Sequence, residues 1–127
     1  MKAPRASKLV VVIEDDPLVL EATGGLLRSW GCRVVAAESY GEAITKLSEI
    51  GQRPDLIVCD YRLPQGPTGV DAIEMLRGAF EIPALLISAD ASSPQREAGQ
   101  GGYHLLHKPV NAAAFRAALI EASVLQR

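Results

Sequence analysis

The chain has 127 residues, and 48% of them are apolar, which favours a single domain with its own hydrophobic core. Its 13 basic and 15 acidic residues give a formal net charge of −2, so the charge indicates no nucleic-acid-binding surface. No apolar run is long enough to span a membrane, and the first eight residues are too short and polar for a signal peptide.

Residues 1–8 are predicted to be a flexible tail, and residues 9–127 the folded domain. The two cysteines, Cys32 and Cys59, are far apart in sequence and form no C-x-x-C pair. We expect both to be buried as small apolar residues, which suits a reducing, cytoplasmic setting.

The first predicted elements are a strand and a helix. Leu9–Ile13 predicts a strand that is buried on both faces. Asp16 is a candidate N-cap, and Pro17 suits the first turn of the helix that follows. Gly24 and Gly25 lie inside this helix and suggest close packing against the sheet. The expected apolar side consists of Leu18, Leu20, Ala22, Leu26, Leu27 and Trp30.

A second strand and helix follow, and then a third strand. Arg33–Ala37 predicts the strand, and Ser39 with Glu42 has the spacing of a capping box that opens a helix to about Ile50. Asp55–Asp60 predicts a third buried strand that ends on a carboxylate.

The remaining elements are shorter. Val70–Phe80 predicts a helix with an apolar side. Residues 84–87 predict a fourth strand that ends at Ser88, and His104–His107 a fifth. The apolar side of the helix is expected to contain Ile73, Met75, Leu76 and Phe80.

Two segments complete the chain. Residues 94–102 contain three glycines and can support a short or frayed helix at best. Asn111 is expected to cap a final, alanine-rich helix that runs through Gln126.

This alternation predicts an α/β fold built from right-handed βαβ units. The expected architecture is a doubly wound, five-stranded parallel sheet with strand order 2-1-3-4-5 and helices on both faces. In that order the first and third strands are neighbours, so the residues that follow them meet at the carboxyl edge where ligands bind.

Charged side chains gather at this predicted edge. Glu14, Asp15 and Asp16 follow the first strand, Asp60 ends the third, and Lys108 follows the fifth. Two carboxylates about 4 Å apart repel by roughly 4 kcal/mol at an effective dielectric of about 20, so a cation is expected between them. Mg²⁺ suits such oxygen ligands. A carboxylate, a metal ion and a lysine are the groups that phosphoryl transfer to an aspartate requires.

Four motifs in chain order strengthen this interpretation: VVVIEDDP at 10–17, DLIVCDYRLP at 55–64, ISA at 87–89 and HKPV at 107–110. With these motifs the chain resembles the response-regulator receiver domains of bacterial two-component signalling, over about residues 9 to 125. The resemblance implies a flavodoxin-like fold.

The resemblance also implies roles for individual residues. Asp60 corresponds to the phosphoacceptor, Ser88 to the hydroxyl that binds the phosphoryl group, and Lys108 to the lysine that pairs with it. Glu14 and Asp15 correspond to the acids that hold Mg²⁺, together with Asp60 and the backbone carbonyl of Arg62. Pro109 corresponds to a cis-proline.

Which pair of neighbouring acids binds the metal, here called the metal frame, stays open at this point. The pair of metal-binding acids could also be Asp15 and Asp16, although Asp16 equally suits the helix cap. His104 and His107 are expected to be surface or packing residues rather than ligands.

Three features depart from the family pattern. Leu105 takes the place of an aromatic residue that usually takes part in the conformational switch. The segment between Ser88 and Lys108 is short and rich in glycine, and the loop at 64–69 is one residue longer than usual. Three strings resemble receivers at the C-terminus of hybrid sensor histidine kinases: DYRLP at 60–64, the extended loop with GPTG at 66–69, and YHLLHKPV at 103–110.

The leading hypothesis is therefore a phosphoacceptor in a phosphorelay that catalyses only its own phosphorylation and dephosphorylation. Its expected partner is a histidine kinase or a histidine phosphotransfer domain, with no nucleic acid and no direct membrane contact, although a parent protein could tether it to a membrane sensor. A stand-alone regulator and a pseudo-receiver that binds proteins without phosphate are the alternatives. A haloacid-dehalogenase-like phosphatase would need an aspartate where Arg62 stands, and a dinucleotide site would need glycines after the first strand.

Overall fold

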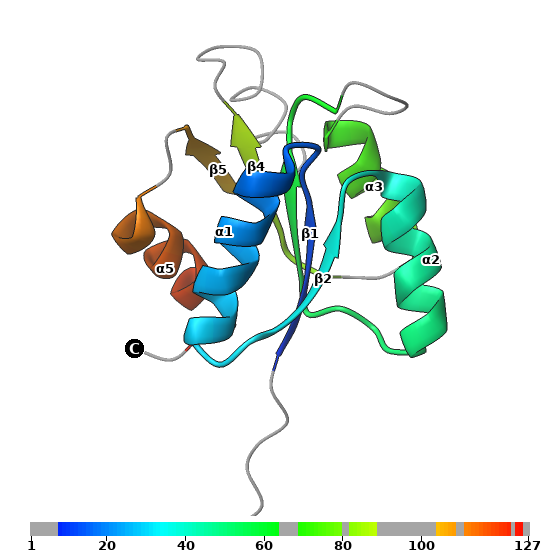
Figure 1. The fold of residues 1–127 in the computed structure, drawn as a ribbon, viewed down its shortest axis with the longest axis horizontal. Helices are drawn as coiled ribbons and strands as arrows, with labels where there is room; N and C mark the ends of the chain where they lie inside the picture. Colours follow the sequence, from blue (N-terminus) through cyan, green and yellow to red (C-terminus); the bar gives the residue numbers. More distant parts are fainter. Residues whose placement is uncertain are drawn as a thin grey trace, which may run out of the picture.

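The computed structural model describes residues 8–63, 69–79, 82–88, 104–108, 111–122 and 124–125. These residues form one five-stranded sheet in the order β2-β1-β3-β4-β5, and every strand pair is parallel. Helices α2 and α3 cover one face of the sheet, and α1 and α5 cover the other (Figure 1). The predicted doubly wound architecture and strand order are confirmed.

The bounds of the elements follow the predicted runs closely. The strands are β1 (Leu9–Ile13), β2 (Arg33–Ala37), β3 (Leu56–Asp60), β4 (Ala84–Ser88) and β5 (His104–His107). The helices are α1 (Pro17–Ser29), α2 (Tyr40–Ile50), α3 (Gly69–Ala79) and α5 (Ala112–Glu121).

Each face of the sheet has its own core because successive side chains of a strand point to opposite faces. Ile57 of β3 belongs to the core under α2 and α3, whereas its neighbour Val58 belongs to the core under α1 and α5. Phe115 of α5 is buried in the second core. Its ring packs edge-on against that of Trp30, with 5.7 Å between the two ring centroids. The predicted packing role of Trp30 is confirmed.

Strand β3 begins one residue later than predicted, and Asp55, the residue before it, instead forms hydrogen bonds with Leu9. Its carboxylate accepts a hydrogen bond from the backbone N–H of Leu9 at 2.8 Å, and its own N–H donates to the Leu9 carbonyl at 2.7 Å. Asp55 therefore joins the start of β1 to the start of β3.

Three helices begin at the predicted caps. Asp16 accepts hydrogen bonds from the first turn of α1, Ser39 accepts from the N–H of Glu42, and Asn111 accepts from the N–H of Ala114. The Glu42 carboxylate reaches the N–H of Glu38 at 2.7 Å rather than that of Ser39. Only half of the predicted capping box is thus formed in its usual way.

Some predictions for the helices are wrong. Leu18 is 77% exposed and is not part of the buried side of α1. It lies about 200° around the helix from the buried Leu20, so the two cannot share a face. Met75 is likewise exposed on α3, and α5 ends at Glu121 rather than running through Gln126.

The two glycines inside α1 are not both explained by packing. A Cβ at Gly24 would meet Val34 at an ordinary 3.7 Å and the flexible end of Arg28 at 3.1 Å. A Cβ at Gly25 would meet no atom within 4 Å. Close packing against the sheet therefore applies to Gly24 alone.

Several predictions concern residues outside the described ranges. They are the tail at 1–7, the loop at 64–68, Phe80, the glycine-rich segment at 94–102, and Pro109. Cys32 and Cys59 are buried free thiols, as predicted, and burial raises the pKa of both. In the part of the chain that the structure describes, no helix combines the length and apolar character that a membrane crossing requires.

Candidate functional site

The acidic side chains converge at the carboxyl edge of the two central strands. Glu14 directly follows β1, Asp60 is the last residue of β3, and these strands are paired in register, with Ile13 opposite Cys59. One carboxylate oxygen each from Glu14, Asp15 and Asp60 can be chosen so that all three lie within 4.8 Å of one another. Glu14 and Asp60 are only 5% and 6% exposed, so both carboxylates are largely removed from water.

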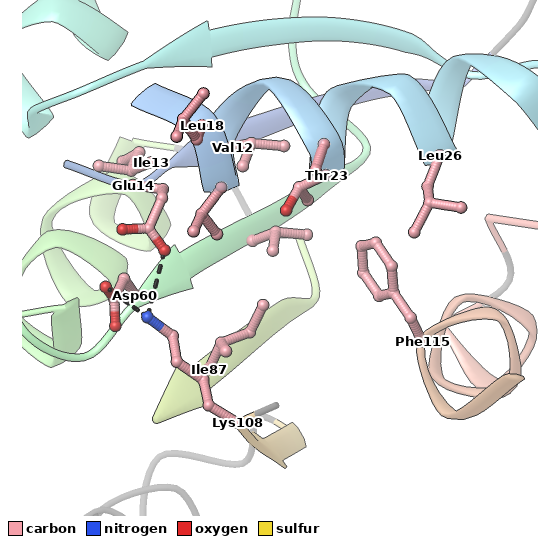
Figure 2. A pocket seen from close by; sticks show the side chains of 13 residues that line it. Val12, Ile13, Glu14, Leu18, Thr23, Leu26, Asp60, Ile87, Lys108 and Phe115 are labelled. Carbon is pink, nitrogen blue, oxygen red and sulfur yellow. Dashed lines mark hydrogen bonds and ion pairs between the residues drawn. The ribbon is translucent and has the colours of Figure 1, made fainter. Parts of the chain in front are cut away.

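Lys108 brings an ammonium group to these acids from the end of β5. Its Nζ lies 3.0 Å from Asp60 Oδ2 and 3.3 Å from Glu14 Oε1, as Figure 2 shows. Its backbone N–H donates to the Ser88 carbonyl at 2.8 Å, which continues the pairing of β4 with β5 by one residue. The strand register therefore delivers the ammonium to the acids.

Backbone amides hold the remaining oxygens of the two buried acids. The N–H of Asp16 donates to Glu14 Oε2 at 3.1 Å, and the N–H of Arg62 donates to Asp60 Oδ1 at 3.3 Å. Each carboxylate is thus oriented by one amide and by Lys108. Such amides stabilise a negative charge that burial would otherwise disfavour.

Burial is the main electrostatic influence on Glu14, and it raises the pKa of this carboxyl from 4.5 to about 7. The Asp16 amide and the Lys108 ammonium act against this rise, whereas the charge of Asp60 adds to it. Burial alone would lower the pKa of Lys108, but its hydrogen bond with Asp60 and the two negative charges outweigh burial and raise it. The ammonium therefore stays charged.

The geometry favours one of the two metal frames. Asp16 is turned toward α1, where its Oδ1 accepts from the N–H of Leu18 at 2.9 Å and of Val19 at 3.3 Å. The three acids that can share one ion are Glu14, Asp15 and Asp60. Asp16 is therefore the helix cap, which was one of the two roles left open.

The other predicted site residues lie around this cluster. Ser88 is buried at the end of β4, one residue beyond the position that pairs with Asp60. Arg62 is exposed and follows Asp60 by two residues. His104 and His107 are exposed, and His104 Nδ1 lies 3.7 Å from Glu121, so neither belongs to the acidic cluster.

Leu105 lies on the face of β5 that packs toward α2 and α3, against the same core as Tyr61. Its neighbour Leu106 packs on the opposite face with α1 and α5. The position that an aromatic side chain usually occupies is thus filled by a half-buried leucine.

The sequence did not reveal a pocket of about 580 Å³ that opens from the acidic cluster and runs between α1 and α5 (Figure 2). Its wall on α1 includes Leu18, Val19, Ala22, Thr23 and Leu26. The spacing i, i+1, i+4, i+5, i+8 of these residues was the available signal, because it marks a single stripe of a helix.

Residues 10–120 match the family described as the response regulator receiver domain. The chain belongs to this family. The match begins within β1 and ends within α5, so it includes all four motifs, and the resemblance inferred from them is confirmed.

Individual relatives support the assignment. The phyllosphere-induced regulator PhyR of Methylorubrum extorquens is 31% identical over 80 residues, which cover 63% of this chain and 30% of that protein. The transcriptional regulatory protein KdpE of Mycobacterium tuberculosis is 31% identical over 113 residues, covering 87% and 49%. The chain thus spans between 30% and 49% of the length of these relatives.

A solved structure shows the same fold. The receiver domain of PhyR from Erythrobacter litoralis superimposes with a TM-score of 0.78 at 28% identity, covering 95% of this chain and 93% of that one. Receiver domains of this family generally bind Mg²⁺ at an acidic pocket, and the cluster of Glu14, Asp15 and Asp60 supplies such a pocket here.

Proposed function

We propose that this domain, residues 9–127, accepts a phosphoryl group from a phosphohistidine onto Asp60 in the presence of Mg²⁺. The observation that carries the proposal is the contact of Lys108 Nζ with Asp60 at 3.0 Å beside two further carboxylates. The proposed nucleophile, the proposed metal-binding acids and the ammonium of Lys108 thus lie close together at the carboxyl edge of the sheet.

The transfer begins when a carboxylate oxygen of Asp60 attacks the phosphorus atom. The O–P bond forms as the N–P bond of the phosphohistidine breaks, and the imidazole nitrogen leaves with the electron pair. Hydrolysis later adds water to phosphorus, breaks the O–P bond and restores the Asp60 carboxylate. The domain catalyses only these two reactions on itself.

Lys108 and Ser88 have roles in this proposal that follow from their positions. The ammonium of Lys108 carries three N–H donors, so it can pass from the Asp60 carboxylate to an oxygen of the arriving phosphoryl group. Ser88 stands at the end of the neighbouring strand, where its hydroxyl can bind a second phosphoryl oxygen. Both interactions stabilise the charge that develops during transfer.

The donor set fits Mg²⁺. Glu14, Asp15, Asp60 and the Arg62 carbonyl offer hard oxygen ligands, and the three carboxylates carry more negative charge than Lys108 alone offsets. When bound, the ion would neutralise charge on the transferring group.

The expected partner is a histidine kinase or a histidine phosphotransfer domain in a cytoplasmic setting. We further propose that the domain belongs to a hybrid histidine kinase, in line with the motif around Asp60 and with Leu105. One matching relative is named a DNA-binding response regulator, the MtrA protein of Mycolicibacterium smegmatis. The absence of a nucleic-acid partner for the parent protein therefore stays a prediction.

Labelling with a small phosphodonor, acetyl phosphate, tests the site. The wild-type domain should be labelled only with Mg²⁺, and Asp60→Asn should lose at least about 100-fold in rate because the amide is no nucleophile. Asp15→Asn should lose labelling through weakened metal binding. Asp16→Asn is the matched control and should label like the wild type, since asparagine also caps a helix.

Equal labelling of Asp60→Asn and wild type would refute the nucleophile assignment. Loss of labelling in Asp16→Asn, with Asp15→Asn unaffected, would reverse the metal frame. Beryllofluoride with Mg²⁺ mimics the phosphoryl group and should shift the amide resonances of Tyr61 and Arg62. If it causes no shifts there, the pseudo-receiver alternative is correct.

A further inference from the structure

The pocket between α1 and α5 is much larger than the phosphoryl chemistry requires. Its volume of about 580 Å³ falls within the range of small-molecule sites in proteins, about 300 to 1,000 Å³. Figure 2 shows it running from Glu14, Asp60 and Lys108 at one end to Phe115 at the other. Val12, Val58 and Ile87 belong to its lining on the sheet side.

The stripe of α1 that lines this pocket differs from the stripe that is buried against the sheet. Leu20, Gly24 and Leu27 are the buried residues of the helix, whereas Leu18 and Val19 are 77% and 40% exposed. Helix propensity does not require large apolar side chains there, since many polar residues form helices equally well. Their exposure beside a buried apolar floor marks a surface suited to an apolar occupant.

The two ends of the pocket differ in chemistry. One end presents the carboxylates of Glu14 and Asp60 with Asp15 close by, against the single ammonium of Lys108. An excess of negative charge in a partly buried site favours a cationic group over an anionic one. The rest of the lining is apolar except for Thr23.

Thr23 is the half-buried polar residue of this otherwise apolar part of the pocket. Its side chain points from α1 toward the pocket in Figure 2. Within the described part of the chain its hydroxyl makes no hydrogen bond, although Thr45 in α2 donates to the carbonyl four residues earlier. A hydroxyl left without a protein partner in an apolar wall is available to a polar atom of a bound molecule.

We propose that this pocket binds a small amphipathic amine. Its ammonium group contacts Glu14 and Asp60, its aliphatic body lies between α1 and the sheet, and an oxygen within its chain accepts a hydrogen bond from Thr23. Binding does not require phosphorylation. Because the ammonium group would use the same carboxylates as a divalent cation, the amine and Mg²⁺ compete.

A matched set of probes tests the ligand chemistry on the wild-type chain. Heptan-1-amine, heptan-1-ol and heptanoate each contain seven carbon atoms in an unbranched chain and differ in head-group charge. In titrations followed by amide NMR, the amine should bind at least about tenfold more tightly than heptanoate, with the alcohol between them. Saturating Mg²⁺ should weaken the amine at least about threefold and leave the alcohol unchanged.

Two variants of α1 test the location. Ala22→Leu adds a side chain inside the pocket at an exposed position, and should weaken heptan-1-amine at least about fivefold by filling space. Gly25→Leu adds the same side chain where a Cβ meets no other atom, and should leave the affinity unchanged. Circular dichroism should show both variants folded.

The role of Thr23 has its own probe. In 3-propoxypropan-1-amine an ether oxygen replaces one methylene of a chain as long as that of heptan-1-amine. Thr23→Val should weaken this ether amine relative to heptan-1-amine at least about threefold, since only the ether can use the hydroxyl. Equal binding of amine and heptanoate, or equal effects of the two leucine variants, would overturn the proposal. If the wild-type domain binds the amine but is not labelled by acetyl phosphate, the proposed function is wrong and the amine site is unaffected.

Discussion

The strands that carry Asp60 and Lys108 hold their charges in different ways. All five residues of β3 are buried between two neighbouring strands. Strand β5 has four residues, none fully buried, and among the described strands it pairs with β4 alone. Asp60 is 6% exposed, and the side chain of Lys108 is 32% exposed. The proposed nucleophile is therefore held by the core, while the cation that we propose binds the phosphoryl group lies where movement costs less.

The largest expected effect compares the two strands directly. Ile57→Ala in β3 should lower the free energy of unfolding by about 3–4 kcal/mol, because a fully buried side chain leaves a cavity. Leu105→Ala in β5 should cost only about 1 kcal/mol, since this side chain is half-exposed. Urea denaturation measures both. Similar losses at the two positions would show that β5 is as firmly held as β3.

The pH dependence of stability tests the part of the site that the core holds, which includes the buried carboxylate of Glu14. The folded-state pKa of Glu14 is raised from 4.5 to about 7, so the folded state binds this proton more tightly than the unfolded state. This stabilising contribution is complete below pH 4.5 and is lost as the pH rises through 7.

The metal-free wild type should therefore lose roughly 2 kcal/mol between about pH 5 and pH 8 relative to Glu14→Gln, after allowance for solvent screening. Denaturation in a chelator at a series of pH values gives the difference. Parallel curves for the two proteins would show that Glu14 keeps an ordinary pKa in the folded state.

Removal of the Lys108 ammonium tests the more exposed part of the site, which follows β5. Lys108→Met keeps the aliphatic stem and removes the charge that neutralises Glu14 and Asp60. Mg²⁺ affinity should rise about tenfold because the ammonium no longer opposes a second cation, whereas labelling by acetyl phosphate should fall. Isothermal titration calorimetry measures the first effect. Unchanged Mg²⁺ affinity would mean that Lys108 leaves the carboxylates before the metal arrives.

The smallest effect is expected at the outer end of β5. His104 and Glu121 lie 3.7 Å apart with exposed side chains, so their contact joins β5 to α5 only weakly. His104→Ala should change the free energy of unfolding by less than about 0.5 kcal/mol. A loss above about 1 kcal/mol would mean that this pair helps to hold the edge strand.

The contrast between strands also explains what sequence could predict. The bounds of β1, β2 and β5 agree with the predicted runs, since short apolar runs between turn residues are strong strand signals. The meeting of Glu14 and Asp60 followed from strand order, whereas the place of Lys108 beside them came from the charge balance and the family resemblance. The buried faces of the helices were harder to predict. Leucine is usually a core residue, and only the position of Leu18 around the helix relative to the buried Leu20 indicates that it is exposed.

Other features depended on contacts that no local pattern contains. The contact of Asp55 with Leu9 joins residues 46 positions apart, and an acid before a strand gives no sign of its partner. The choice between Asp15 and Asp16 turned on which carboxylate faces the helix N–H groups. The pocket depended on the placement of α5 relative to α1, which the sequence pattern leaves open.

The pairing of Leu9 with Asp55 also fixes where the polypeptide enters the domain. Leu9 is the first residue of β1 and Glu14 follows its last, so the two lie at opposite ends of the strand, about 16 Å apart at the usual rise per residue. Any protein fused upstream, whether a purification tag or a kinase core, is thus joined at the far side of the sheet from the proposed phosphoacceptor. A donor domain supplied by the same polypeptide would need a linker long enough to pass along the whole sheet to reach Asp60.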